Sequence, residues 1–256
     1  MLARTLPVSE TPSGSPATPA APPSIEVVGL GKHFGTATAL DGITFRLRAG
    51  EFLTVFGPNG AGKTTLIRIL ATLARPSSGS VRIFGEDAAH AAAGLRRRIG
   101  LVSHRSLLYA SLSARQNLVF FARMFGVADA EERAREMLVE MGLEHRMDDP
   151  VQSYSRGMEQ RCAIARALVH RPEVLLLDEP FSGLDPAASE RLDALLDLER
   201  RRGRTIVLTS HDLGRGANLA DRVAILTRGR LFFEAAKADL PESIETLYRR
   251  HTRGRI

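Results

Sequence analysis

The sequence Gly57-Pro58-Asn59-Gly60-Ala61-Gly62-Lys63-Thr64 decides the fold of this chain. It fits the pattern G-x4-G-K-[S/T], whose glycines let the backbone fold around phosphate oxygens with its N–H groups pointing inward. The apolar run Phe52–Phe56 precedes it, and apolar residues at helical spacing follow it, namely Leu66, Ile69, Leu70 and Leu73. The sequence therefore predicts a buried strand, a phosphate-binding loop and a helix in direct succession.

The residue types in this loop predict separate tasks for its members. The Lys63 ammonium is expected to reach the β- and γ-phosphates of a nucleotide, and the Thr64 hydroxyl to bind Mg²⁺. The start of the following helix adds positive potential for the phosphates. The predicted nucleotide-binding residues of this segment are Gly57, Pro58, Asn59, Gly60, Ala61, Gly62, Lys63, Thr64 and Thr65.

Two more strands are predicted to end in polar residues that suit phosphate chemistry. Val174-Leu175-Leu176-Leu177 runs into Asp178 and Glu179, and Thr205–Thr209 runs into Ser210 and His211. We expect Asp178 to hold Mg²⁺, directly or through water, and Glu179 to polarise the water that attacks the γ-phosphate. Ligands bind at the carboxyl ends of strands in open α/β sheets, so these residues are predicted to meet the loop.

The pattern of apolar residues predicts an α/β fold. Unbroken apolar strands alternate with helices, as in a parallel sheet that is covered on both faces. Between about 104 and 171 the spacing becomes helical, which predicts a helical subdomain inserted into the sheet domain. Strands are expected at Ile25–Leu30, Ile43–Leu47, Phe52–Phe56, Val174–Leu177, Thr205–Thr209 and Val223–Leu226, and a helix around Glu190–Arg202.

Composition and charge limit the class of protein. Residues 1–24 are rich in Pro, Ala, Ser and Thr and are expected to be disordered, ahead of a domain at 25–240 and a helix with a basic tail at 241–256. No run approaches the length of a membrane span, and the single cysteine, Cys162, indicates a cytosolic chain. The net charge of +6 lies in short basic runs without aromatic residues, so nucleic-acid binding is not expected.

Four further segments stand in a recognisable order along the chain. Phe34 precedes a glycine near the first strand, and Tyr154-Ser155-Arg156-Gly157-Met158 opens a predicted helix. Ser182-Gly183-Leu184-Asp185 follows the carboxylate pair, and His211 follows the last of the three strands. Together with the phosphate loop, these segments resemble the ATP-binding subunit of an ABC transporter from about Ile25 to Leu231.

The resemblance implies a P-loop ATPase core with a mostly parallel sheet, an antiparallel β edge and a helical subdomain. It implies that adenine stacks on Phe34, that Asp185 belongs to the D-loop beside the nucleotide, and that His211 contacts the γ-phosphate. Two such subunits are implied to meet head to tail, with Ser155 and the Gly157 N–H completing the cage around the partner's γ-phosphate. Integral membrane permease subunits are the other implied partners, at the cytoplasmic face of the membrane.

Two positions depart from the common family pattern. His104 stands where most relatives have a glutamine that contacts Mg²⁺ and the attacking water, and Arg156 and Met158 replace the usual glycine and glutamine of the signature. The predicted catalytic residues are Glu179, His211, Lys63 and His104. At both positions the residues of this chain resemble those of the haem exporter ATPase of cytochrome c maturation.

The alternatives are the ATPase of another small exporter of drugs, lipids or ions and, in a different class, a soluble ABC ATPase acting on DNA or the ribosome. Family members of that last class carry tandem cassettes or a long coiled-coil insertion, and this chain shows neither.

The apolar residues Leu107, Leu108 and Tyr109 lie in the segment that follows His104. We predict that they line a groove that receives a helix of the membrane partner.

Overall fold

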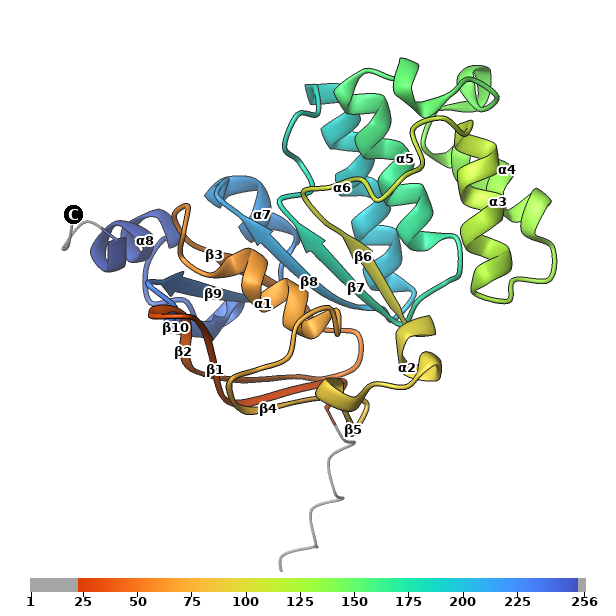
Figure 1. The fold of residues 1–256 in the computed structure, drawn as a ribbon. Helices are drawn as coiled ribbons and strands as arrows, with labels where there is room; N and C mark the ends of the chain where they lie inside the picture. Colours follow the sequence, from red (N-terminus) through yellow and green to blue (C-terminus); the bar gives the residue numbers. More distant parts are fainter. Residues whose placement is uncertain (1–22, 253–256) are drawn as a thin grey trace, which may run out of the picture.

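Two β-sheets form the framework of residues 23–252, the part of the chain that the computed structural model describes (Figure 1). The larger sheet has the order β10-β9-β3-β8-β7-β6, and its strands are parallel except for the pair β10–β9. The smaller sheet, β2-β1-β4-β5, is antiparallel. The strands are β1 Ile25–Phe34, β2 Ala37–Leu47, β3 Phe52–Phe56, β4 Ser78–Ile83, β5 Glu86–Asp87, β6 Ile99–Val102, β7 Val174–Asp178, β8 Thr205–Ser210, β9 Arg222–Thr227 and β10 Arg230–Ala236.

Helices cover both faces of the larger sheet. The α-helices are α1 Lys63–Leu70, α2 Ala93–Arg97, α3 Ala114–Met124, α4 Ala130–Glu140, α5 Arg156–Leu168, α6 Pro186–Arg201, α7 Leu213–Leu219 and α8 Ile244–Thr252. Short 3₁₀ turns lie at Ala88–His90, Glu144–Arg146, Val151–Ser153 and Lys237–Asp239. In Figure 1, α1 lies between the two sheets, while α3 to α6 lie beyond the other face of the larger sheet.

Strand β7 shows why the core has two sides. Successive side chains of a strand point to opposite faces, so Leu175 and Leu177 join the core that contains α3 to α6. Val174 and Leu176 join the core that contains α1 and the antiparallel sheet. All four side chains are fully buried, which explains the unbroken apolar run in the sequence. The predicted α/β fold with a mostly parallel sheet and an antiparallel β part is confirmed.

Several predicted boundaries were wrong. Helix α1 ends at Leu70, and Leu73 lies beyond it with 57% of its surface exposed, because Thr72 takes a left-handed backbone conformation at φ 60° and Pro76 follows. The predicted strand Ile43–Leu47 is the second half of β2, which begins at Ala37.

Strands β4, β5, β6 and β10 were not predicted. The short strand β6 contains Gly100, where a Cβ would lie 2.5 Å from the Ala167 carbonyl oxygen, so glycine here permits the close approach of α5.

The helical segment predicted at about 104–171 contains α3, α4 and α5, but its core is not separate. Cys162 and Leu168 of α5 belong to the same buried cluster as Leu175 of β7 and Leu208 of β8. Burial raises the pKa of the Cys162 thiol to about 12, which agrees with the role of a small apolar core residue. Helix α5 therefore joins the helical segment to the sheet.

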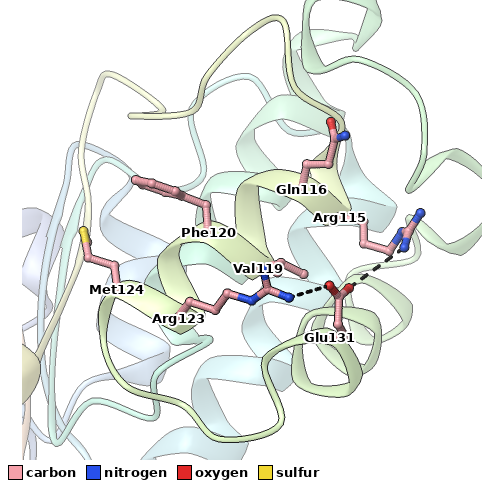
Figure 2. A pocket seen from close by; sticks show the side chains of 7 residues that line it. All are labelled: Arg115, Gln116, Val119, Phe120, Arg123, Met124 and Glu131. Atoms are coloured by element: carbon pink, nitrogen blue, oxygen red, sulfur yellow. Dashed lines mark hydrogen bonds and ion pairs between the residues drawn. The ribbon is translucent and has the colours of Figure 1, made fainter.

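Helix α3 carries an exposed apolar side. Phe120 and Met124 point to the same side of the helix (Figure 2), and 43% and 51% of their surfaces are exposed. A cavity of about 630 Å³ lies along α3 and the start of α4, and Glu131 forms ion pairs there with Arg123 and Arg115. None of the helices in residues 23–252 has the length and apolar character that a membrane crossing requires.

The ends of the chain lie largely outside the described residues. Most of the extension predicted at 1–24 precedes residue 23, and the basic residues Arg253 and Arg255 follow residue 252. Helix α8 lies within the predicted C-terminal segment 241–256 and packs through Ile244 and Leu247 against Phe56 and Val223.

Candidate nucleotide site

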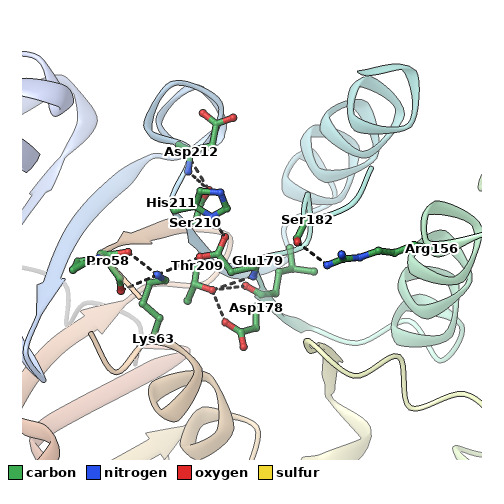
Figure 3. Close-up of polar contacts among 12 residues, drawn as sticks. Pro58, Lys63, Arg156, Asp178, Glu179, Ser182, Thr209, Ser210, His211 and Asp212 are labelled. Carbon is green, nitrogen blue, oxygen red and sulfur yellow. Dashed lines mark hydrogen bonds and ion pairs between the residues drawn. The ribbon is translucent and has the colours of Figure 1, made fainter. Parts of the chain in front are cut away.

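Three neighbouring parallel strands bring the predicted site together. In the larger sheet β3, β8 and β7 lie side by side, and their carboxyl ends lead into the loop 57–62, into His211 and into Glu179 (Figure 3). The phosphate loop therefore meets the residues that follow the two other strands, as the sequence predicts.

Glycine is needed at two loop positions for steric reasons. A Cβ at Gly57 would collide with the Leu226 carbonyl oxygen, and one at Gly62 would lie 2.5 Å from the Ala39 carbonyl oxygen. Gly62 also has φ 106°, a conformation that side chains disfavour. The resulting concave loop, the start of α1 and Glu179 line a cavity of about 230 Å³. The lining residues from the loop and from α1 are Pro58, Asn59, Gly60, Ala61, Gly62, Lys63, Thr64 and Thr65.

The N-terminus of α1 faces this cavity with its positive potential intact. Gly62 caps the helix without a side-chain hydrogen bond, and the first turn carries no acidic residue. The first N–H groups of an α-helix lack partners within the helix, so they are available to an anion. This arrangement suits the phosphate groups of a nucleotide.

Lys63 brings a nearly buried positive charge to the cavity, since only 6% of its surface is exposed. Its Nζ donates to the carbonyl oxygens of Gly57, at 2.6 Å, and Pro58, at 3.3 Å. Nζ also lies 3.2 Å from Oε1 of Glu179, an ion pair without hydrogen-bond geometry. The ammonium group is therefore held between the loop backbone and the carboxylate.

Thr209, a residue that the sequence pattern does not predict for the site, holds the Asp178 carboxylate and the Glu179 backbone. Asp178 and Thr209 are paired across β7 and β8, and the fully buried Thr209 Oγ1 donates to Asp178 Oδ1 at 2.7 Å. The same Oγ1 accepts from the Glu179 N–H at 3.1 Å. Glu179 has a left-handed backbone, φ 51°, so its side chain leaves the strand direction and turns toward Lys63.

His211 contacts the other oxygen of the Glu179 carboxylate. Its Nδ1 lies 2.7 Å from Glu179 Oε2, and because a carboxylate only accepts, Nδ1 is the protonated ring nitrogen in this contact. Glu179 therefore lies between the Lys63 ammonium and the His211 ring (Figure 3). A carboxylate fixed at both oxygens is suited to orient and deprotonate one water molecule.

His104 lies beside the same carboxylates. It lines a cavity of about 350 Å³ together with Asp178, Glu179 and Arg156. A neighbouring cavity of about 470 Å³ is lined by Thr64, His104 and Asp178. Thr64 and Asp178 thus line a common space, and the oxygen ligands that these two residues carry fit Mg²⁺.

Five predicted nucleotide-binding residues do not line the loop cavity, namely Phe34, Gly57, Ser155, Gly157 and Asp185. Phe34 is not a core residue, because 53% of its surface is exposed and Lys32 Nζ lies 5.0 Å from its ring centre. Ser155 caps α5 by accepting from the Met158 N–H at 3.3 Å, and Asp185 caps α6 by accepting from the Ala188 N–H at 2.7 Å.

Comparisons with known proteins agree with this geometry. A family model described as ABC transporter matches residues 40–182. The chain is 40% identical over 220 residues to the daunorubicin resistance ATP-binding protein DrrA3 of Streptomyces coeruleorubidus, an alignment that covers 85% of this chain and 69% of that protein. It is 39% identical over 223 residues to the Nod factor export ATP-binding protein I of Paraburkholderia xenovorans, covering 85% and 72%.

Solved structures agree as well. A dimeric ATP-binding cassette in a post-hydrolysis state, bound to ADP and Pi, superposes with a TM-score of 0.77 at 28% identity and covers 83% of this chain and 98% of that one. An ATP-binding subunit of an ABC transporter gives a TM-score of 0.81 at 29% identity, covering 88% and 98%. The chain therefore belongs to the ABC transporter family, as one of its ATP-binding and ATP-hydrolysing subunits.

Proposed function

We propose that this chain is the peripheral motor subunit of a membrane exporter and that its turnover depends on Glu179 as the general base. The observation that carries the proposal is the fixed position of this carboxylate, between Lys63 Nζ at 3.2 Å and His211 Nδ1 at 2.7 Å, at the edge of the phosphate-loop cavity. Glu179 accepts the proton of the attacking water, and His211 holds the carboxylate in place.

Two groups of the chain would counter the charge of the phosphates. Lys63 and the N-terminus of α1 attract the β- and γ-phosphate oxygens. The Thr64 hydroxyl and the Asp178 carboxylate would hold Mg²⁺, which supplies further positive charge to the same oxygens when bound. Thr209 keeps Asp178 oriented for this task through its 2.7 Å hydrogen bond.

The proposal includes a head-to-tail pair of ATPase subunits. Ser155 is exposed at the N-terminus of α5, and the N–H of Gly157 belongs to the first turn of the same helix. Both lie outside this chain's own loop cavity, so they are free to contact a nucleotide held by a second subunit. The solved structure of a dimeric cassette with ADP and Pi supports such a pair.

Exposed apolar residues near His104 support docking of a membrane permease. Leu107 and Tyr109 have 46% and 51% of their surfaces exposed, and Tyr109 makes an edge-to-face contact with Phe120 at 5.3 Å between ring centres. Leu108 does not fit the predicted groove, because it packs against the core cluster. We propose that Leu107, Tyr109, Phe120 and Met124, here called the docking patch, receive a permease segment.

The shape of the docking patch depends on one buried amide. Asn117 is fully buried, and its Oδ1 accepts from the Tyr109 N–H at 2.7 Å. Its Nδ2 donates to the carbonyl oxygens of Tyr109, at 3.0 Å, and Ser113, at 2.9 Å. Because both backbone groups of Tyr109 are held, the chain that carries the exposed ring has a defined position.

For the cargo, we favour a small molecule other than haem. His104 and the Ser155-Arg156-Gly157-Met158 signature support the haem hypothesis, but the two relatives described above are named for daunorubicin resistance and Nod factor export. Haem export for cytochrome c biogenesis therefore stays a prediction that rests on a few residues of the sequence.

Affinity capture tests the proposal. The tagged chain is purified from detergent-solubilised membranes of its own cell, beside the variants Leu107→Glu and Tyr109→Glu, with Arg97→Glu, exposed on α2, as the control. We expect the parent chain and the control to retain an integral membrane partner that the two patch variants lose.

The identity of the captured proteins separates the alternatives. Partners that belong to cytochrome c assembly would restore the haem hypothesis. Recovery of ribosomes or DNA, without any membrane protein, would overturn the exporter proposal and favour a soluble ABC ATPase.

A further inference from the structure

Arg156 lies between two functional segments of the same subunit. It is the first residue of α5, and its Nη2 donates to Ser182 Oγ at 3.2 Å (Figure 3). A Cβ at Gly183 would lie 2.6 Å from Arg156 Nε and 2.9 Å from its Cδ, so the side chain rests directly on the Gly183 backbone. With φ 82°, Gly183 also has a backbone that favours glycine.

The turn that Arg156 contacts starts at the proposed general base. The Ser182 N–H donates to the Glu179 carbonyl oxygen at 3.1 Å, and the Leu184 N–H donates to the Phe181 carbonyl oxygen at 3.2 Å. Ser182 is therefore one hydrogen-bonded turn away from Glu179. A displacement of Ser182 is transmitted to Glu179 through this turn.

A second side chain of α5 holds the same turn. Gln160 lies four residues after Arg156, on the same face of the helix, and its Nε2 donates to the Pro180 carbonyl oxygen at 3.0 Å. Arg156 and Gln160 also line one cavity together with Glu179 and Ser182. The first turns of α5 thus contact the turn after Glu179 at two points. The contact to Ser182 is made by the long cationic side chain of Arg156, and the contact to Pro180 by the neutral side chain of Gln160.

We propose that Arg156 is a positioning residue that links the signature end of α5 to the turn 179–184, so that α5 sets the position of Glu179 for hydrolysis. The guanidinium fork holds Ser182 while its stem covers Gly183. Arg156 is exposed in the single subunit and lies beside Ser155, on the side where the proposed partner subunit closes. Closure would shield this hydrogen bond from water, which strengthens it when the reaction takes place.

This inference rests on the proposed role of Glu179, so the test includes a Glu179 variant. Steady-state ATP hydrolysis is measured for the full-length parent chain and for five variants, namely Arg156→Gly, Arg156→Lys, Ser182→Ala, the Arg156→Gly/Ser182→Ala double variant and Glu179→Gln. Arg97→Ala is the control, because Arg97 is exposed on α2 and lies apart from both cavities beside Glu179. A displacement of a catalytic group by about 1 Å or less already slows the chemical step. We therefore expect Arg156→Gly to lower kcat about tenfold, while KM changes by less than about twofold.

The pattern among the variants identifies a positioning role. We expect Ser182→Ala to lower kcat by a similar factor and the double variant to be no slower than Arg156→Gly, because both changes remove one interaction. We expect Arg156→Lys, which keeps a cationic nitrogen able to donate to Ser182 Oγ, to recover most of kcat, and Arg97→Ala to match the parent chain. Thermal unfolding identifies any variant that fails to fold, and Arg156→Lys and Ser182→Ala then carry the comparison.

The inference is overturned if Arg156→Gly keeps its kcat, if KM rises while kcat is unchanged, or if the effects of Arg156→Gly and Ser182→Ala multiply in the double variant. Glu179→Gln separates the two proposals. Turnover by Glu179→Gln would reject the role of Glu179 itself. An inactive Glu179→Gln beside a fully active Arg156→Gly would reject only the role of Arg156.

Discussion

Replacing Glu179 by glutamine tests the arrangement at the centre of the site. Glutamine keeps the size of the side chain, and its Oε1 can still accept from His211 Nδ1, as Glu179 Oε2 does at 2.7 Å. The substitution removes the negative charge that lies 3.2 Å from Lys63 Nζ and the ability to take a proton from water. The fold is expected to be unchanged, so any effect on turnover reports on chemistry.

The geometry gives the size of two opposite effects. A positioned general base contributes about 10²–10⁴ in rate, so kcat should fall by that factor, which corresponds to about 3–5 kcal/mol. Lys63 exchanges a charged neighbour for a neutral one, and an interaction of this kind is worth about 1–2 kcal/mol. ATP affinity is therefore expected to rise about tenfold.

Two measurements on one preparation separate these effects. Phosphate release gives kcat, and titration with ATP under non-hydrolysing conditions gives Kd. Size-exclusion chromatography with ATP should also reveal a dimer that persists, because the phosphate cage remains while turnover is lost. A kcat within about threefold of the parent, or weaker ATP binding, would refute the assignment of Glu179 as the base that pairs with Lys63.

Three further predictions concern other parts of the chain. Lys63→Ala should weaken ATP binding about 100-fold by calorimetry, since a phosphate loses a charge-assisted hydrogen bond; an unchanged Kd would reject the loop assignment. Burial lowers the pKa of His170 to about 4 from about 6.5, so the unfolded chain binds the proton first and stability falls as the pH decreases from about 6.5 to about 4. In His170→Phe, which keeps the stacking on Phe125, the thermal midpoint should depend less on pH in this window, and a slope equal to that of the parent would contradict this origin. Asn117→Ala should lower the free energy of unfolding by about 2–4 kcal/mol in urea titrations, because it leaves the backbone groups around Tyr109 without partners, whereas a loss below about 0.5 kcal/mol would contradict that role.

The sequence predicts those site residues well whose type and distance from a predicted strand already identify their role. Lys63 and Glu179 follow apolar strands whose burial is evident from their composition, and the structure brings both residues together. Parallel strands that end at one sheet edge make this juxtaposition a consequence of the fold class. Local pattern and topology thus point to the same place.

Contacts that depend on strand register or on tertiary packing could not be predicted in this way. Thr209 has the pattern of an ordinary strand residue, and its role follows only from its pairing with Asp178 across β7 and β8. Leu73 and Leu108 have similar apolar character, yet Leu73 is exposed beyond the end of α1 and Leu108 packs, partly buried, against the core. Hydrophobicity alone does not decide between a core position and an exposed one.

The two ends of helix α5 lie in different surroundings, and this difference affects how the helix can move. Its 13 residues span about 20 Å, and the half that contains Cys162 and Leu168 is clamped in the core shared with the sheet. The other end, at Arg156, is free of that clamp and exposed. A tilt of about 5° around the buried half would move Arg156 by about 1–2 Å. A small rotation of α5 about its buried half therefore leaves the core packing almost unchanged. The same rotation produces its largest displacement at the exposed end of the helix, on the face that a second subunit would meet.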